Sequence, residues 1–208
     1  MAFQVPELQG SKYRIYEHGY LNYFVDKVYY FQAPHELTKT ALDLSQQQRS
    51  QGTHSYVKRL AGDLKEEYLL WSLNEPVHPE FAESVQQMFQ PHCETIVREK
   101  CQGLLNDVWV NFQKSGEHNP LHKHSGTFSF VWYLDIPQEI RDEHLAQTSS
   151  TRSRGMIEFT AERSNDTLRF NPKTNDVFLF RADHNHQVYP FYSDNERVSI
   201  AGNINVVF

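Results

Sequence analysis

The second half of the chain is a series of short apolar runs separated by Asn, Asp, Pro and Gly, and this pattern limits the fold more than any other feature. Short runs of β-branched and aromatic residues that are bounded by turn residues indicate strands. Many such strands in succession favour an antiparallel sandwich or barrel. We expect strands at residues 108–112, 128–136, 156–160, 168–170, 176–180, 186–192 and 198–208.

The first half of the chain follows a different pattern. Residues 11–33 are rich in Tyr and Phe, which favours one or two strands. Apolar residues at helical spacing predict a short helix over 34–44, and the polar stretch 45–52 after it predicts a loop. Over 76–104 apolar residues recur at every third or fourth position, which predicts an amphipathic helix that Pro91 kinks or splits. Helices before strands indicate the α+β class.

Composition excludes several classes of protein. With 208 residues and 39% hydrophobic content, the chain can bury the core of one domain, and its net charge of −6 makes nucleic-acid binding unlikely. The N-terminus lacks a secretory signal and no apolar run is long enough to span a bilayer, so we expect a cytoplasmic protein without a membrane partner. Cys93 and Cys101 are too far apart on the expected helix for a disulfide, which fits a reducing compartment.

Histidines gather at two places among the expected strands. His122 and His124 stand just before the run 128–136, and alternate residues of a strand point to one side, so the pair can bind one metal ion. His186 follows about sixty residues later in a His-x-Val-x-Pro sequence, with Arg197 eleven residues beyond it. Three neutral imidazoles leave one side of a first-row metal open for a chelating cosubstrate and dioxygen, and zinc with a bound water is an alternative.

The two histidine motifs resemble those of a known enzyme family. Residues 119–126, NPLHKHSG, are similar to a motif of virus-encoded iron(II)- and 2-oxoglutarate-dependent oxygenases, in the group related to prolyl hydroxylases. The resemblance covers roughly residues 105–208 and implies a double-stranded β-helix, a jelly-roll or cupin-like barrel with helices packed outside. It implies that Fe(II) is bound by His122, His124 and His186, and that Arg197 pairs with the far carboxylate of 2-oxoglutarate.

One position departs from the usual pattern of this family, because most members have Asp or Glu where this chain has His124. An all-histidine set leaves the metal site more positive by one charge. A three-histidine cupin-like dioxygenase that needs no oxoacid is therefore an alternative, as is a non-catalytic β-barrel that serves as a binding or structural protein. A carboxylate could also enter from elsewhere, with Asp135 and Glu158 as the nearest candidates. His184 competes with His186 as a ligand.

Arg197 favours the reading with 2-oxoglutarate, because its planar guanidinium suits a carboxylate in two-point contact. Ser199 and Asn203 share its strand face and are expected to bind the cosubstrate. Trp132 is a further candidate for the wall of this site, although core packing explains it equally well. Weaker candidates on the preceding strand are Asn111 and Gln113.

The resemblance therefore predicts an enzyme that couples oxidative decarboxylation of 2-oxoglutarate to hydroxylation of an unknown substrate, with a peptidyl proline suggested only by the relatives. Its partners would be 2-oxoglutarate, dioxygen and a peptide or small molecule, and a homodimer is an option. A virus-encoded chain would work in the host cytoplasm. We expect residues 1–104 to be a strand and helix region that packs on the oxygenase core of residues 105–208, in one structural domain.

Overall fold

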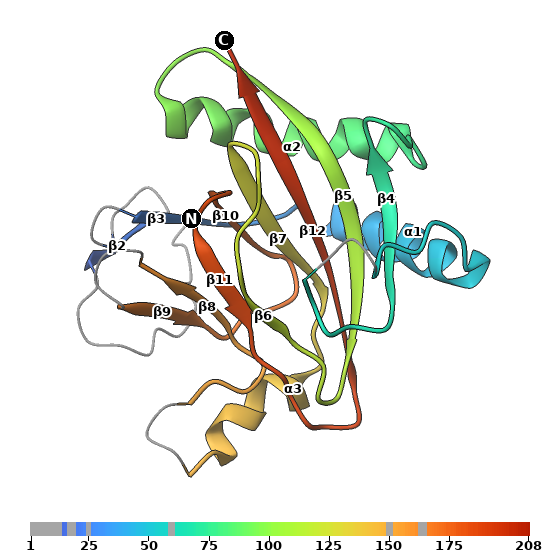
Figure 1. Ribbon diagram of the computed structural model, residues 1–208, viewed down its shortest axis with the longest axis vertical. Helices are drawn as coiled ribbons and strands as arrows, with labels where there is room; N and C mark the ends of the chain where they lie inside the picture. The colour runs from blue at the N-terminus through green and yellow to red at the C-terminus, as the bar shows by residue number, and fades with distance from the viewer. Residues whose placement is uncertain (1–13, 16–19, 24–25, 58–60, 149–151, 162–165) are drawn as a thin grey trace.

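The computed structural model describes residues 14–15, 20–23, 26–57, 61–148, 152–161 and 166–208. These residues form two antiparallel β-sheets, one of eight strands and one of four, with helices packed outside the larger sheet (Figure 1). Among these residues no helix is both long and apolar enough to cross a bilayer.

The larger sheet contains strands from both halves of the chain. Its central strands run antiparallel, and the last strand pairs with two neighbours along most of its length. In spatial order the strands are β1 (Arg14–Ile15), β2 (Tyr20–Tyr23), β3 (Asp26–Gln32), β10 (Asp176–Arg181), β7 (Phe128–Asp135), β12 (Glu196–Val207), β5 (Gln102–Lys114) and β4 (Glu67–Ser72).

The smaller sheet is built from the second half of the chain alone. It contains, in spatial order, β6 (Asn119–His122), β11 (Asn185–Val188), β8 (Ile157–Thr160) and β9 (Thr167–Phe170). All seven strands expected beyond residue 105 are therefore present, and the predicted antiparallel architecture is observed. The pattern of apolar runs bounded by turn residues predicted these seven strands.

The N-terminal strands differ from the prediction. Residues 11–33 contribute three strands, β1 to β3, where one or two were expected. Strand β4 was not expected at all. Its core sequence, Tyr68-Leu69-Leu70-Trp71, is continuously apolar because it is covered on both sides, so it lacks the alternation of a half-buried strand.

Helix α1 (His35–Gln51) is longer than the sequence predicted, and the expected loop at 45–52 was wrong. Glutamine is a good helix former, and the polar residues Ser45 and Gln48 are buried on the inner side of the helix. The Ser45 hydroxyl donates to the Ala41 carbonyl, which satisfies it inside the helix. The helix ends at Gly52, whose φ of 63° is the left-handed conformation that glycine adopts easily.

Helix α2 (Pro79–Val97) is one helix with Pro91 inside it. Of the two expected effects of Pro91, a kink or a split, the split does not occur. Pro79 occupies the first turn, where its missing N–H has no helical partner to lose. The helix ends at Val97 because Arg98 takes the left-handed conformation, with a φ of 61°, and Cys101 therefore lies outside the helix. Both cysteines are free. A short α3 (Gln138–Asp142) and a 3-10 turn (Glu143–Ala146) follow β7.

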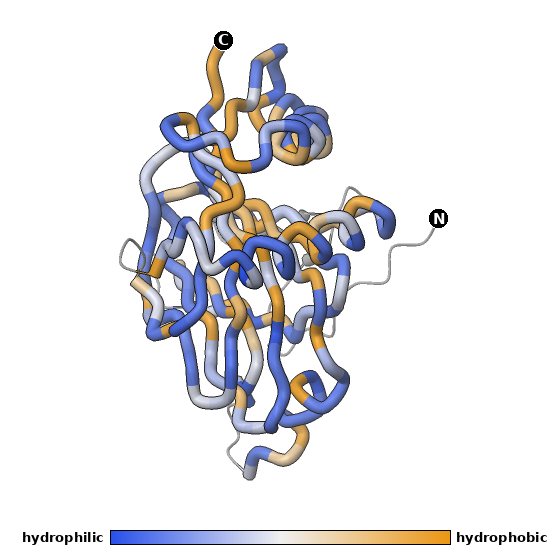
Figure 2. Tube along the Cα trace, turned by 90° about the vertical axis from the view of Figure 1, so that its right-hand side faces the viewer, coloured by the Kyte–Doolittle hydropathy of each residue, from blue (hydrophilic) through white to orange (hydrophobic). Residues whose placement is uncertain are grey.

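The hydrophobic core has two parts, one on each face of the larger sheet. On one face Phe81 and Phe89 of α2 pack against Trp132 and Phe130 of β7, with ring centroids 6.5 and 4.3 Å apart. The other part lies between the two sheets and includes Phe159 of β8. Figure 2 shows apolar residues concentrated along the central strands and hydrophilic residues in the loops. The sheet therefore has a helix side and a pocket side.

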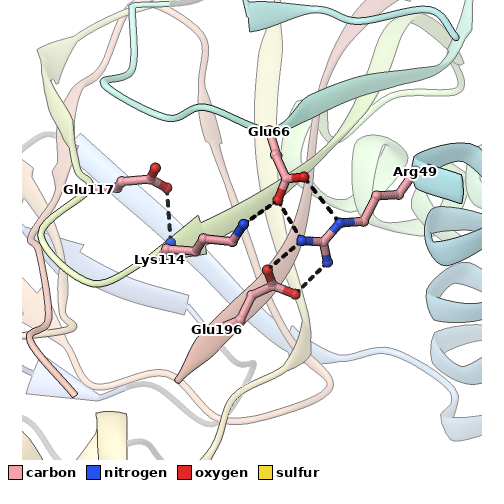
Figure 3. Close-up of polar contacts among 5 residues, drawn as sticks. All are labelled: Arg49, Glu66, Lys114, Glu117 and Glu196. Atoms are coloured by element: carbon pink, nitrogen blue, oxygen red, sulfur yellow. Dashed lines mark hydrogen bonds and ion pairs between the residues drawn. The ribbon is translucent and has the colours of Figure 1, made fainter. Parts of the chain in front are cut away.

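A network of ion pairs ties α1 to the helix side of the sheet (Figure 3). The Arg49 guanidinium pairs with Glu66, which directly precedes β4, and with Glu196 of β12, at N–O distances of 2.5 and 2.8 Å. Glu66 also accepts from the Lys114 ammonium at 2.7 Å. The guanidinium lies over the ring of Phe112, 4.4 Å from its centre. Two acidic and two basic side chains thus neutralise one another.

Candidate metal and oxoacid site

Three histidines converge on the pocket side. His122 ends β6 and lies opposite His186 in the paired strand β11, so strand pairing alone brings these two side chains together. His124 follows β6, and its backbone N–H donates to the Ala182 carbonyl at 2.7 Å, which holds the segment in place. One ring nitrogen from each histidine lies within 4.8 Å of the others. This is the set named from the sequence.

Hydrogen bonds orient two of the rings. The Nδ1 of His122 lies 2.6 Å from the Pro120 carbonyl oxygen, and the Nδ1 of His186 lies 3.0 Å from the His184 carbonyl oxygen. A carbonyl oxygen only accepts, so each Nδ1 carries the hydrogen and each Nε2 keeps a free lone pair. Backbone partners of this kind fix the tautomer that a metal needs.

The histidines are neutral near pH 7. Burial lowers the pKa of His124 to about 4, with a further contribution from the nearby His122. Burial also lowers the pKa of His122 and places the pKa of His186 well below its usual value. A metal therefore does not have to displace protons from these rings, and the donor set fits a first-row divalent cation.

Arg197 of β12 lies in the wall of the same pocket. Its side chain is 1% exposed, and its guanidinium donates to the Gly155 carbonyl and to the side-chain oxygen of Gln113. The Nε has no partner, and no carboxylate forms an ion pair with this guanidinium among the residues that the structure describes. Burial lowers the pKa of Arg197. The pocket thus contains a buried cation without a counter-ion, which is costly unless an anion binds there.

The other predicted cosubstrate residues separate into two groups. Ser199 lines the pocket and accepts from the Asn111 amide at 3.5 Å. Asn111 and Gln113, the weaker candidates, line it as well. Asn203 lies further along the same face of β12, away from the pocket lining, and its side-chain oxygen accepts from Ser129. The structure therefore gives Asn203 a partner within the sheet.

Trp132 does not lie where the sequence suggested. Its side chain is fully buried on the helix side against Phe81, whereas its neighbours Val131 and Tyr133 line the pocket. The reason is the segment between His124 and β7, where Gly126 has a φ of 111° and the chain is not a strand. The alternation of faces cannot be carried across such a break.

The alternative ligands are occupied or turned away. Glu158 pairs with Arg169 and accepts from the Gln187 amide, Asp135 is exposed, and His184 lies outside the converging group of three. No carboxylate completes a metal site with the three histidines in the described part of the chain.

Tyr133 and Glu67 are among the pocket residues that the sequence analysis missed. The Tyr133 hydroxyl is buried and has no hydrogen-bond partner in the described part of the chain, and the Tyr133 ring lies 5.5 Å from the Arg197 guanidinium. Glu67 of β4 is 1% exposed and also lines the pocket. The sequence carries no signal that separates Glu67 from Glu66, because both glutamates precede the apolar run of β4. For Tyr133 the signal was alternation counted within β7 alone, from Val131.

The two opposed antiparallel sheets, with the three imidazoles and the buried guanidinium in the pocket between them, define the double-stranded β-helix class of metal-dependent oxygenases. Residues 107–203 match the model of a family described as "Putative 2OG-Fe(II) oxygenase". This part of the chain therefore matches the iron(II)- and 2-oxoglutarate-dependent oxygenases, as the resemblance implied. The predicted enzyme class and the cofactors Fe(II) and 2-oxoglutarate are confirmed.

Solved structures share the fold at low sequence identity. A prolyl-4-hydroxylase from Pseudomonas putida has a TM-score of 0.58 and 12% identity, covering 91% of this chain and 93% of that one. A 2OG-Fe(II) oxygenase family protein from Burkholderia pseudomallei has a TM-score of 0.60 and 13% identity, covering 86% of this chain and 84% of that one. A viral collagen prolyl hydroxylase from Paramecium bursaria Chlorella virus-1 has a TM-score of 0.57 and 12% identity, covering 87% of this chain and 96% of that one. These matches confirm the double-stranded β-helix fold. No curated protein matches the chain.

Proposed function

We propose that the protein hydroxylates its substrate at an iron held by His122, His124 and His186, with 2-oxoglutarate bound between this metal and Arg197. The observation that carries the proposal is the unpaired Arg197 guanidinium in the same pocket as three converging neutral imidazoles. When bound, iron with 2-oxoglutarate supplies the oxidising power for insertion of oxygen into a C–H bond.

The chain's own residues bind and orient the cosubstrate. The Nε2 atoms of His122 and His186 point their lone pairs away from the backbone carbonyls that hold each Nδ1–H. The Arg197 guanidinium offers hydrogen bonds to the far carboxylate of the oxoacid. The Tyr133 ring lies 5.5 Å from this guanidinium, and its hydroxyl, which has no partner among the described residues, is a further donor. Ser199 lies on the same wall. The apolar residues around these groups exclude water and strengthen the contacts.

We propose a peptidyl substrate, with proline as the residue oxidised. The support is the fold shared with a bacterial prolyl-4-hydroxylase and with a Trichoplax adhaerens prolyl hydroxylase solved with a peptide fragment. The test is succinate formation stimulated by proline-rich peptides and not by the same peptides with alanine in place of proline.

Three further proposals concern the whole chain. Residues 1–104 and 105–208 form one structural domain, which is supported by strands of both regions in the larger sheet. A cytoplasmic location is supported by the two free cysteines. A homodimer is tested by the mass of the protein in solution.

Anaerobic titration with Fe(II) and 2-oxoglutarate tests the site. The expected result is a visible charge-transfer band that requires both additions. Iron binding without that band would support the three-histidine dioxygenase that needs no oxoacid. Absence of tight iron binding would support the non-catalytic binding protein.

A further inference from the structure

One carboxyl group in the pocket has no role in the site described so far. Glu67 opens β4 opposite Asn111 of β5, and Asn111 lies opposite Ser199 of β12, so the three side chains form a row across the pocket wall. The Glu67 side chain is 1% exposed, and its Oε2 has no hydrogen-bond partner among the described residues. A buried carboxyl oxygen without a hydrogen-bond partner costs free energy, so its presence calls for an explanation such as a function.

A second buried carboxyl group stands near it. Glu117, 6% exposed, accepts from the Lys114 backbone N–H at 2.9 Å through one oxygen (Figure 3). Its other oxygen has no partner among the residues that the structure describes. Neither acid forms an ion pair in the described part of the chain. Burial, and secondarily the charge of Glu117, raise the pKa of Glu67 to about 8. Glu67 therefore carries a proton near pH 7 in the metal-free protein.

The donor set leaves a charge to be balanced. Three neutral imidazoles do not offset a divalent metal, and the dianionic oxoacid offsets the metal alone, so the Arg197 charge remains in excess. Family members with a carboxylate ligand do not have this excess. Glu67 is not among the groups that converge within 4.8 Å, so it can act only through space.

We propose that Glu67, with Glu117 behind it, is the counter-charge of the metal centre and supplies from outside the coordination sphere the negative charge that the three histidines lack. The inference rests on the proposed function, since it requires the metal to bind at the histidines. When the divalent cation binds, the Glu67 O–H bond breaks, the carboxylate keeps the electron pair and the proton passes to solvent. Glu67 is thus a positioning residue for charge and not a ligand.

The groups around Glu67 are consistent with this role. The other side chains that β5 contributes to this wall, including Asn111 and Gln113, are uncharged. The titratable and charged groups that face the pocket from the remaining elements are Tyr133, Arg197, His122, His124 and His186. Glu117 does not line the pocket, and it acts on Glu67 through its charge. A carboxylate that lines the same buried pocket as a divalent cation is expected to tighten metal binding by roughly tenfold or more.

The test is an anaerobic calorimetric titration of the full chain with Mn(II) alone, in buffers of different ionisation enthalpy, between about pH 6.5 and 8.5. The wild-type protein is expected to release up to about one proton per metal near pH 7, and its dissociation constant should fall as the pH rises. Glu67→Gln should bind Mn(II) roughly tenfold more weakly near pH 8. It should release no proton from this source, so its affinity should depend little on pH.

Two further variants make the test specific. Glu66→Gln makes the same chemical change one residue earlier, on the helix side, and should keep the wild-type proton release. Glu117→Gln removes the neighbouring charge, so more Glu67 is already ionised and fewer protons should be released, with binding still tight. Wild-type affinity and proton release in Glu67→Gln, or undiminished release in Glu117→Gln, would overturn the inference.

Failure of the proposed function gives a different result. If wild-type protein and His122→Ala bind Mn(II) equally, or neither binds it, the metal site itself is wrong and the role of Glu67 falls with it. If His122→Ala loses the metal while Glu67→Gln behaves as wild type, only the counter-charge is refuted.

Discussion

The charged side chains on the two faces of β4, β5 and β12 differ in burial and in whether they form ion pairs. On the helix side, Arg49, Glu66, Lys114 and Glu196 form a closed network in which every charge has a partner, and three of these side chains are about a quarter exposed. On the pocket side, Arg197 is fully buried and has no ion pair among the described residues. Adjacent residues, Glu196 and Arg197, thus belong to different kinds of site.

The difference separates charges that hold the fold from charges that await a ligand. Paired, partly hydrated ions contribute modestly to stability and lose little when the protein is empty. An unpaired buried ion costs free energy until something binds, so its presence indicates a site. Four variants, from the largest expected effect to the smallest, test whether this division holds.

His122→Ala should have the largest effect. The alanine removes one of three metal ligands, and we expect iron affinity to fall by on the order of a hundredfold or more. The measurement is anaerobic iron titration. Lys123→Ala is the matched control, since Lys123 lies between the two histidines with its side chain exposed. Equal iron affinity in both variants would contradict the assignment of His122.

Arg197→Met should leave iron binding intact and weaken 2-oxoglutarate binding by roughly a hundredfold, because a charge-assisted contact is lost. The free energy of unfolding should be unchanged or higher, since the variant removes an unpaired buried cation. Oxoacid titration and urea unfolding measure the two quantities. A large loss of stability with unchanged oxoacid affinity would place Arg197 with the structural charges.

Tyr133→Phe should weaken 2-oxoglutarate binding by about threefold to tenfold, the value of one hydrogen bond. Burial raises the pKa of Tyr133 to about 12, so its hydroxyl remains a donor throughout the accessible pH range. The free energy of unfolding should stay the same because this hydroxyl has no hydrogen-bond partner among the residues that the structure describes. Wild-type affinity in this variant would remove Tyr133 from the oxoacid site.

Arg49→Met should have the smallest effect on function and a small effect on stability. We expect oxoacid affinity to be unchanged and the free energy of unfolding to fall by about 1 kcal/mol, because these ions are partly hydrated. Burial opposes ionisation of Glu66, but hydrogen bonds from Lys114 and Arg49 hold the pKa of Glu66 below its ordinary 4.5. The stabilisation is therefore complete above pH 4.5 and is lost as the pH falls through the lower value. The account would be contradicted if the free energy of unfolding of the wild type exceeded that of Arg49→Met by the same amount at acid and neutral pH.

Sequence predicted the part of the fold in which local pattern and burial agree. The seven strands expected beyond residue 105 alternate or end at turn residues, and the His-x-His pair lies next to one of them. Strand β6 (Asn119–His122) was not expected. The prediction of a loop at 45–52 was wrong because its polar side chains suggested a solvent-exposed segment, whereas Ser45 and Gln48 of α1 are buried. Glu67 could not be assigned to the pocket from the sequence. It reaches the pocket because β4 pairs with β5, a strand that comes much later in the chain. Tertiary contacts decided both cases.

The helix-side core limits how the oxygenase segment can be used in isolation. Residues 107–203 match the family model, yet Phe130 and Trp132 within them are covered by Phe81 and Phe89 of α2. A fragment excised at these boundaries would present a bare aromatic wall and an uncapped β5 edge to water, and we expect it to precipitate. Any minimal version made for crystallography or engineering should keep the chain from α1 onward.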